Sequence, residues 1–207
     1  MNSNQSSIIV VSGLPRSGTS MMMKMLEAGG VKLLEDNKRC ADEDNPKGYF
    51  EYEKVKNLQK DSTWLSIARG KAIKIISMLL YHLPPVYRYR IIFMQRAMDE
   101  VLASQKRMLA RRSKAGRTSL PDSNCDDLSL ASKFANHLIR IDQWLSKQPN
   151  IEFIYVDYNE LLRAPEATIA RLCCFLDLES NHEKMSSIID SSLYRNRHIA
   201  EGNSRRP

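Results

Sequence analysis

Four short apolar runs are spaced along the chain, and each predicts a buried strand. The first, Ile8-Ile9-Val10-Val11, is β-branched and uniformly apolar, as expected for a strand that is covered on both faces. Residues 72–77, 89–95 and 151–156 have the same apolar character. Uninterrupted apolar runs of this kind are typical of strands in parallel sheets.

Longer segments between these runs carry apolar residues at intervals of three and four, which predicts helices. One helix is expected over Thr19–Ala28, where a pair of glycines stops it. Others are expected over residues 98–112 and in the segment that Pro149 ends. A further helix is expected to begin around Pro165, because proline is tolerated in the first turn of a helix. Strands that alternate with helices predict an α/β fold with a mostly parallel sheet, in which ligands bind at the carboxyl ends of the strands.

The composition is that of an ordinary soluble protein, with 43% hydrophobic and 27% charged residues, and we expect residues 1–207 to form a single domain. The longest apolar run is far too short to span a bilayer. The first residues lack the basic segment and the long apolar stretch of a secretory leader, so the expected location is cytoplasmic. Four scattered cysteines without metal-type spacing predict neither a metal site nor a disulfide.

The formal net charge of +7 is compatible with polyanionic partners. A solvated basic face accounts for much of this excess. The densest basic cluster comprises Lys106, Arg107, Arg111, Arg112, Lys114 and Arg117. No aromatic residues are interleaved with these charges, which argues against nucleic acid as a partner.

A glycine-rich loop, residues 12–20, connects the first predicted strand to the first predicted helix. Glycines five positions apart, Gly13 and Gly18, permit a tight turn and a close backbone approach, while N–H groups at a helix start converge on an anion. Arg16 adds a positive charge. The hydroxyl donors of the loop are Ser17, Thr19 and Ser20. The loop is therefore expected to hold a phosphate or phosphosulfate group.

This loop differs from the ATP- and GTP-binding Walker A loop, which reads G-x-x-x-x-G-K-[ST]. Thr19 stands where that motif has its lysine, which argues against an ordinary nucleotide triphosphatase or kinase. The stretch Pro15-Arg16-Ser17-Gly18-Thr19-Ser20 after a strand instead resembles the 5′-phosphosulfate loop of the sulfotransferase family. The resemblance implies a P-loop-type three-layer α/β/α domain, with residues 16–20 around the donor.

That family uses 3′-phosphoadenosine 5′-phosphosulfate (PAPS) as sulfuryl donor and releases 3′-phosphoadenosine 5′-phosphate (PAP), with no metal expected. A second stretch also resembles the family: Arg96 at the end of a predicted strand is followed eight positions later by Ser104 in a helix, as in its 3′-phosphate segment. Ser104 lies roughly 9 Å along the helix axis from Met98, within reach of an extended arginine. The resemblance assigns both residues to the 3′-phosphate.

A third stretch, residues 45–51 (Asn-Pro-Lys-Gly-Tyr-Phe-Glu), resembles a segment of some bacterial sulfotransferase-like proteins. Sulfuryl transfer to a hydroxyl needs a base near the acceptor and a cation near the bridging oxygen of the leaving group. Glu51 and His82 are the base candidates, because related enzymes use either residue type. For the cation, Lys74 stands in an otherwise apolar strand, as in the family, and Arg16 can share its role.

The leading hypothesis is a PAPS-dependent sulfotransferase whose acceptor is a hydroxyl-bearing small molecule, glycan or peptide. We expect residues 35–70 and 113–125 to form acceptor-side loops, and residues 195–207 to form a flexible tail. Two alternatives stay open. Asp157, which ends an apolar run, could belong to a Mg²⁺-dependent kinase. The chain could also be a non-catalytic module that binds a nucleotide or another polyanion.

Overall fold

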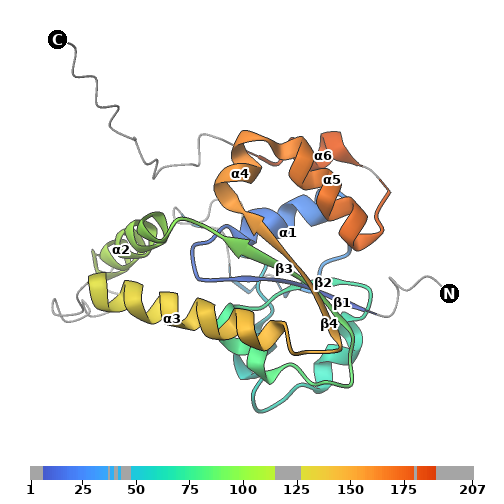
Figure 1. The fold of residues 1–207 in the computed structure, drawn as a ribbon, viewed down its shortest axis with the longest axis horizontal. Helices are drawn as coiled ribbons and strands as arrows, with labels where there is room; N and C mark the ends of the chain where they lie inside the picture. Colours follow the sequence, from blue (N-terminus) through green and yellow to red (C-terminus); the bar gives the residue numbers. More distant parts are fainter. Residues whose placement is uncertain are drawn as a thin grey trace, which may run out of the picture.

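A computed structural model describes residues 7–36, 38–39, 42, 48–114, 127–179 and 181–189. In this part of the chain, four strands form one sheet in the order β2-β1-β3-β4 (Figure 1). Their bounds are β1 (Ile8–Gly13), β2 (Ala72–Lys74), β3 (Tyr89–Gln95) and β4 (Ile151–Asp157). Every neighbouring pair is parallel, which confirms the predicted α/β class.

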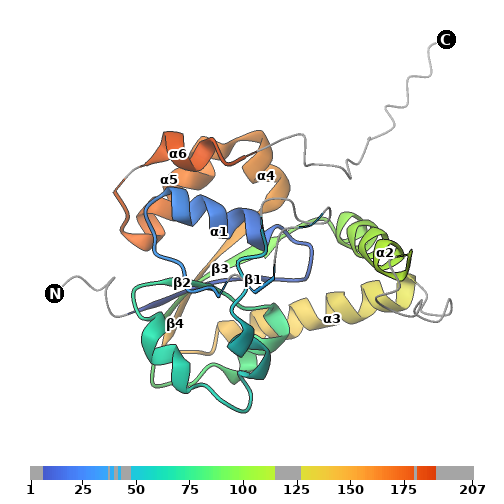
Figure 2. The same ribbon diagram turned by 180° about the vertical axis from the view of Figure 1, so that it is seen from behind.

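Helices cover both faces of the sheet. The α-helices are α1 (Thr19–Ala28), α2 (Met98–Lys114), α3 (Asp127–Leu145), α4 (Tyr158–Arg163), α5 (Pro165–Leu176) and α6 (His182–Ser186). Three short 3₁₀ helices are η2 (Glu53–Asn57), η3 (Thr63–Ala68) and η4 (Ser77–His82). Helices α1, α4, α5 and α6 lie on one face, while α3 and the 3₁₀ helices lie on the other (Figures 1 and 2). The predicted three-layer arrangement is therefore confirmed.

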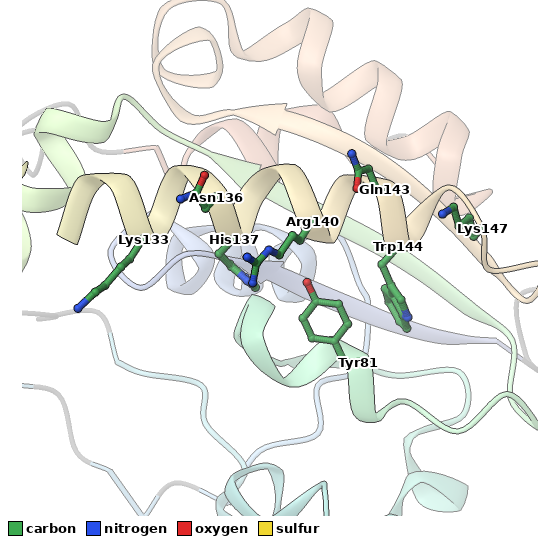
Figure 3. Close-up of a pocket in the computed structure, with 8 residues that line it drawn as sticks. All are labelled: Tyr81, Lys133, Asn136, His137, Arg140, Gln143, Trp144 and Lys147. Atoms are coloured by element: carbon green, nitrogen blue, oxygen red, sulfur yellow. The ribbon is translucent and has the colours of Figure 1, made fainter. Parts of the chain in front are cut away.

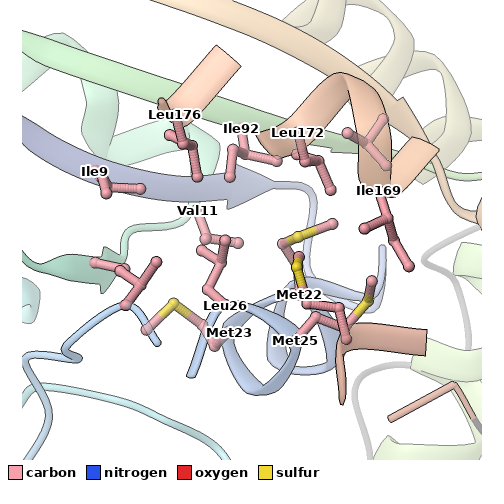
Figure 4. Packing of buried hydrophobic residues seen from close by; sticks show 14 of the residues in the cluster. Ile9, Val11, Met22, Met23, Met25, Leu26, Ile92, Ile169, Leu172 and Leu176 are labelled. Carbon is pink, nitrogen blue, oxygen red and sulfur yellow. The ribbon is translucent and has the colours of Figure 1, made fainter. Parts of the chain in front are cut away.

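Strand β1 contributes side chains to two separate cores, because successive side chains of a strand point to opposite faces. Ile9 and Val11 pack with α1, α5 and α6 (Figure 4). Ile8 and Val10 pack with the 3₁₀ helices and with α3. All four side chains are at least 97% buried, so β1 is covered on both faces as its sequence predicts.

The second strand is shorter than the predicted one, which extends to residue 77. The strand β2 ends at Lys74, paired with Val11, and only Ile75 adds one further hydrogen bond, from its N–H to the Val11 carbonyl at 3.0 Å. Val11 is the last β1 residue that pairs with β2, so the chain leaves the sheet and Ser77 begins η4. A short segment at residues 32–34 pairs with the outer edge of β2 instead, which the sequence did not predict.

Other predicted elements agree with the structure more closely. The helix around Pro165 begins at that residue, and the helix after Thr19 has the predicted bounds. The short helix α4 between β4 and α5 was not predicted. Residues 45–47 of the third motif, residues 115–126 and residues 190–207 lie outside the described residues. Among the described helices, none is long and apolar enough to cross a membrane.

Candidate active site

The glycine-rich loop, residues 12–20, which we call the anion loop, spans the turn from β1 to α1 and depends on two glycines. Gly13 has a φ of 146°, and a Cβ atom there would lie 2.6 Å from the Met94 carbonyl oxygen. Gly18 has a φ of 99°, and a Cβ atom there would lie 2.4 Å from the Tyr158 ring. No larger residue fits either position without displacing backbone or a packed ring. The backbone of the loop can therefore approach an anion closely.

The start of α1 is prepared for negative charge. Its first turn has no acidic residue, and no side chain caps its N–H groups. These groups and the positive end of the helix dipole attract an anion. The Ser17 hydroxyl is buried and has no hydrogen-bond partner among the described residues. A bound anion would satisfy both sets of donors.

Arginine side chains link the anion loop to the second motif. Arg16, whose φ of 73° is in the left-handed region, donates from Nε to the Ser104 hydroxyl at 2.9 Å. Arg96 donates from Nη1 to the Arg16 carbonyl oxygen at 3.2 Å. The two residues expected at the 3′-phosphate, Arg96 and Ser104, thus both contact Arg16. The structure brings the first two sequence motifs together at one end of the sheet.

Glu100 orients Arg96 and was not predicted from the sequence. Its side chain is 2% exposed, and Oε2 accepts a hydrogen bond from Arg96 Nε at 2.8 Å. Asn159 Nδ2 donates to the other oxygen at 3.2 Å, and the Arg96 guanidinium lies 4.3 Å from the Tyr158 ring centroid. The spacing of four residues, from Arg96 after the end of β3 to Glu100 in the first turn of α2, was the available signal. Because both carboxylate oxygens are bonded, the guanidinium has a defined orientation.

Lys74 ends β2 beside the anion loop and is almost buried, with 9% of its side chain exposed. Its ammonium donates to the Tyr49 carbonyl oxygen and lies 3.5 Å from the Ser20 hydroxyl and 3.4 Å from Glu51 Oε1. Burial lowers the pKa of Lys74 to about 8, although the Glu51 carboxylate opposes this shift. Arg16 lowers the pKa further through its charge. The predicted cation and one predicted base therefore belong to a single cluster at the sheet edge.

Two residues that the sequence did not single out complete this cluster. Arg39 Nη1 donates to Glu51 Oε1 at 2.8 Å, and its guanidinium carbon lies 3.3 Å from the Tyr49 ring centroid. Glu35 interacts electrostatically with Lys74. Burial raises the pKa of Glu35, as do the charges of Glu27 and Asp36, whereas the charge of Lys74 lowers it. No sequence motif marks either residue. Both are near the site because the segment before them, residues 32–34, pairs with β2.

The second base candidate, His82, is placed differently. It ends η4 and has no hydrogen bond or ion pair to Lys74 or Glu51 among the described contacts. The imidazole that faces η4 is His137 of α3, whose Nε2 lies 2.9 Å from the hydroxyl of buried Ser77. The structure therefore joins Glu51, and not His82, to the predicted cation.

Asp157 has a structural role. Its Oδ1 accepts a hydrogen bond from the Glu160 N–H at 2.7 Å, so Asp157 caps the N-terminus of α4. It also ends β4, which β3 separates from the strand that leads into the anion loop. Because two strand spacings amount to about 10 Å, Asp157 ends its strand about that far from the end of β1. Within the described residues, no group of three or more His, Cys, Asp or Glu side chains could hold a metal ion.

The chain belongs to the sulfotransferase family: the family profile described as a sulfotransferase domain matches residues 6–198. The sulfotransferase domain of the Synechococcus PCC 7002 olefin synthase is similar in structure, with a TM-score of 0.52 and 13% identity over 94% of this chain and 84% of that one. Mouse sulfotransferase SULT7A1, solved with PAP, matches with a TM-score of 0.55 and 16% identity over 94% and 67%.

A sulfotransferase domain from the curacin biosynthetic pathway matches with a TM-score of 0.53 and 15% identity over 89% of this chain and 78% of that one. Comparison with curated protein sequences finds no match. The fold is therefore that of sulfotransferases from bacteria and mammals, as the first two motifs predict.

Proposed function

We propose that this protein is an enzyme that transfers a sulfuryl group from PAPS to a hydroxyl group of its acceptor. One observation carries the proposal: the buried Lys74 ammonium lies between the Ser20 hydroxyl of the anion loop and the Glu51 carboxylate. A cation and a base candidate thus stand directly beside an anion cradle, which is what transfer of a charged group requires. The PAP in the structure of mouse SULT7A1 supports PAPS as the donor.

The residues of the donor site fit PAPS. Backbone N–H groups of residues 16–20 bind the 5′-phosphosulfate, together with the hydroxyls of Ser17, Thr19 and Ser20. The unpartnered, buried Ser17 hydroxyl supports this assignment, because such a donor is costly unless a ligand satisfies it. Arg96 and Ser104 bind the 3′-phosphate, and Glu100 keeps the planar fork of Arg96 in position for it.

PAPS supplies the sulfuryl group that is transferred. Glu51 takes the proton of the acceptor hydroxyl. At the same time the oxygen of that hydroxyl bonds to sulfur, and the bond between sulfur and the 5′-phosphate oxygen breaks, so that PAP leaves. Lys74 and Arg16 stabilise the negative charge that develops on that phosphate oxygen. His82 is the second candidate for the base, and its separation from Lys74 in the described contacts favours Glu51.

The kinase alternative has less support. In a Walker loop, the hydroxyl at the position of Ser20 binds Mg²⁺. Here the Lys74 ammonium lies 3.5 Å from that hydroxyl, so a side-chain cation stands where a kinase needs its metal. Asp157, the candidate metal ligand, is instead the N-cap of α4. A non-catalytic binding module would share the donor site and would differ only in the absence of transfer.

Calorimetric titration with PAP and with ADP tests the donor site. We expect about tenfold or greater selectivity for PAP, since only PAP offers a 3′-phosphate to Arg96 and Ser104. Equal affinity for the two nucleotides, or no binding, would contradict the proposal. Transfer of labelled sulfate from PAPS to a panel of hydroxyl acceptors should persist in excess EDTA. Phosphoryl transfer from ATP that is lost in EDTA and in Asp157→Asn would favour the kinase, and PAP binding without transfer would favour the binding module.

A further inference from the structure

A groove of about 640 Å³ runs between α3 and η4, on the face of the sheet opposite α1 (Figure 3). Three of its cations, Lys133, Arg140 and Lys147, follow one another at intervals of seven residues. Seven residues are two turns of a helix, so Lys133 and Arg140 share one face of α3, and Lys147 lies in the turn directly after the helix ends at Leu145, about 20 Å from Lys133 along the helix direction. The groove is therefore long enough for an extended ligand.

The positive charge of this groove is not neutralised within the described part of the chain. None of the described residues that line it is acidic, and no described ion pair involves Lys133, Arg140 or Lys147. Asp142 of the same helix accepts a hydrogen bond from the Tyr155 hydroxyl instead. Burial and the neighbouring Arg140 lower the pKa of His137, so the charge of the groove comes from the three cations. These exposed cations are therefore available to an anionic ligand.

The rest of the lining is suited to sugar rings. Tyr81 reaches from η4 toward α3, with its ring centroid 5.2 Å from that of Trp144 and 6.1 Å from that of His137, both edge to face (Figure 3). Asn136 and Gln143, also seven residues apart, add side-chain amides that both donate and accept hydrogen bonds. Amides recognise hydroxyl groups, aromatic side chains pack on the apolar faces of sugars, and cations bind carboxylate or sulfate groups.

The groove adjoins the Lys74–Glu51 cluster. His137, in its lining, contacts the Ser77 hydroxyl at 2.9 Å. Ser77 is three residues beyond Lys74, so their Cα atoms are at most about 11 Å apart. The groove and the carboxyl end of β2 therefore lie near each other, and a sugar chain that is longer than the groove can reach the cluster.

We infer that this groove binds an acidic oligosaccharide, and that this oligosaccharide is the acceptor of the sulfuryl group. The part of the inference that concerns the acceptor rests on the proposed function, whereas binding in the groove does not. Arg140, at the middle of the stripe, contacts an acidic group of the sugar chain, and Lys133 and Lys147 contact acidic groups on either side of it.

Titration of the tryptophan fluorescence tests the inference directly, because Trp144 lines the groove. The probes are oligosaccharides of hyaluronan, polygalacturonate and heparin, with a neutral maltooligosaccharide and oligoglutamate as controls. We expect at least one acidic oligosaccharide to bind more tightly than both controls. The triple variant Lys133→Gln, Arg140→Gln, Lys147→Gln should weaken this binding by about tenfold or more, since each exposed ionic contact contributes modestly.

A matched variant controls for net charge. Lys32→Gln, Arg107→Gln, Lys184→Gln removes the same number of exposed cations from other elements and should leave oligosaccharide binding unchanged. PAP affinity should be the same in both triple variants, and in the groove variant transfer to the bound oligosaccharide should fall through a higher KM.

Two kinds of result would overturn the inference. One is that none of the three acidic oligosaccharides binds, or that oligoglutamate binds as tightly, which would make the groove a site for charge alone. The other is that the triple variant of Lys133, Arg140 and Lys147 binds the acidic oligosaccharide as tightly as the original protein does. Failure of PAP to bind would contradict the proposed function and leave the oligosaccharide measurement to decide the groove by itself. PAP and oligosaccharide binding without transfer would confine the groove to a binding role and would refute the assignment of the acceptor.

Discussion

The anion loop and the Lys74–Glu51 cluster lie side by side at the carboxyl ends of β1 and β2, but they are built in different ways. The loop is one contiguous segment whose shape comes from backbone, with positive φ at Gly13, Arg16 and Gly18. The cluster is made of side chains from separate segments that meet only through packing, with Lys74 buried at its centre. The loop should therefore be sensitive to added volume, and the cluster to changes of charge.

The largest effect is expected from removing the cluster's central charge. Lys74→Met keeps a long apolar side chain and should lower the transfer rate by about 10²- to 10³-fold, as for other groups that stabilise developing charge. PAP affinity should change much less, since the loop is intact. Steady-state kinetics and PAP titration measure the two quantities. Lys32→Met, an exposed lysine on the neighbouring edge segment, is the control. An equal loss of rate and of PAP affinity would show that the two regions do not act separately.

Added volume in the loop should have the opposite signature. Gly18→Ala places a methyl group against the Tyr158 ring at a φ of 99°, so the loop must shift. The shifted N–H groups then converge less well on the 5′-phosphate, and we expect PAP affinity to fall by about tenfold or more, as for the loss of a hydrogen bond to a charged group. Gly30→Ala is a matched control, because its φ is 93° but no atom lies within 4 Å of the added methyl group. It should lower thermal stability and leave PAP binding intact. Similar PAP affinity in the two variants would show that the close packing on Tyr158 does not shape the site.

A smaller effect is expected where the loop meets the second motif. Glu100→Gln removes the carboxylate that compensates the nearly buried Arg96, and should lower the free energy of unfolding by about 1–3 kcal/mol. The 3′-phosphate of PAP would restore a negative partner, so PAP should raise the melting temperature of the variant more than that of the original protein. Glu152→Gln, which removes an exposed partner of Arg90, should change neither quantity appreciably. An unchanged response to PAP would argue against Arg96 as the 3′-phosphate ligand.

The smallest effect is a shift in pH dependence. With its pKa at about 8, Lys74 loses its proton as the pH rises past that value, and transfer should fall there. The Glu51 carboxylate raises this pKa and the Arg39 charge lowers it. The basic limb of the pH–rate profile should therefore move to higher pH in Arg39→Gln. Glu51→Gln removes the proposed base and with it most of the transfer, so in this variant the pKa of Lys74 is followed by NMR titration of its ammonium group and should fall. Shifts in the same direction would contradict the role of Lys74 as the titrating cation.

The difference between a contiguous backbone loop and a cluster of side chains from separate segments explains what could be predicted from the sequence. The strand before the anion loop, its glycines, and the helix after it depend on local backbone preferences and on the period of apolar residues, and all three were predicted. Arg96 and Ser104 were selected because their segment resembles the family's 3′-phosphate segment, and their role there stays a prediction. The end of β2 was misjudged, because a strand ends where its partner stops pairing, and the partner is distant in sequence.

The sequence by itself determined the α/β class and the glycine-rich loop between the first strand and the first helix, because each depends on neighbours within a few positions along the chain. Only the tertiary structure decided that Glu51 rather than His82 adjoins Lys74, and that Arg39 and Glu100 take part. It also decided that Asp157 caps a helix and that α3 and η4 enclose a cationic groove. The physical reason is that burial, ion pairing and the pKa of Lys74 depend on contacts between segments that only the packing of the sheet brings together.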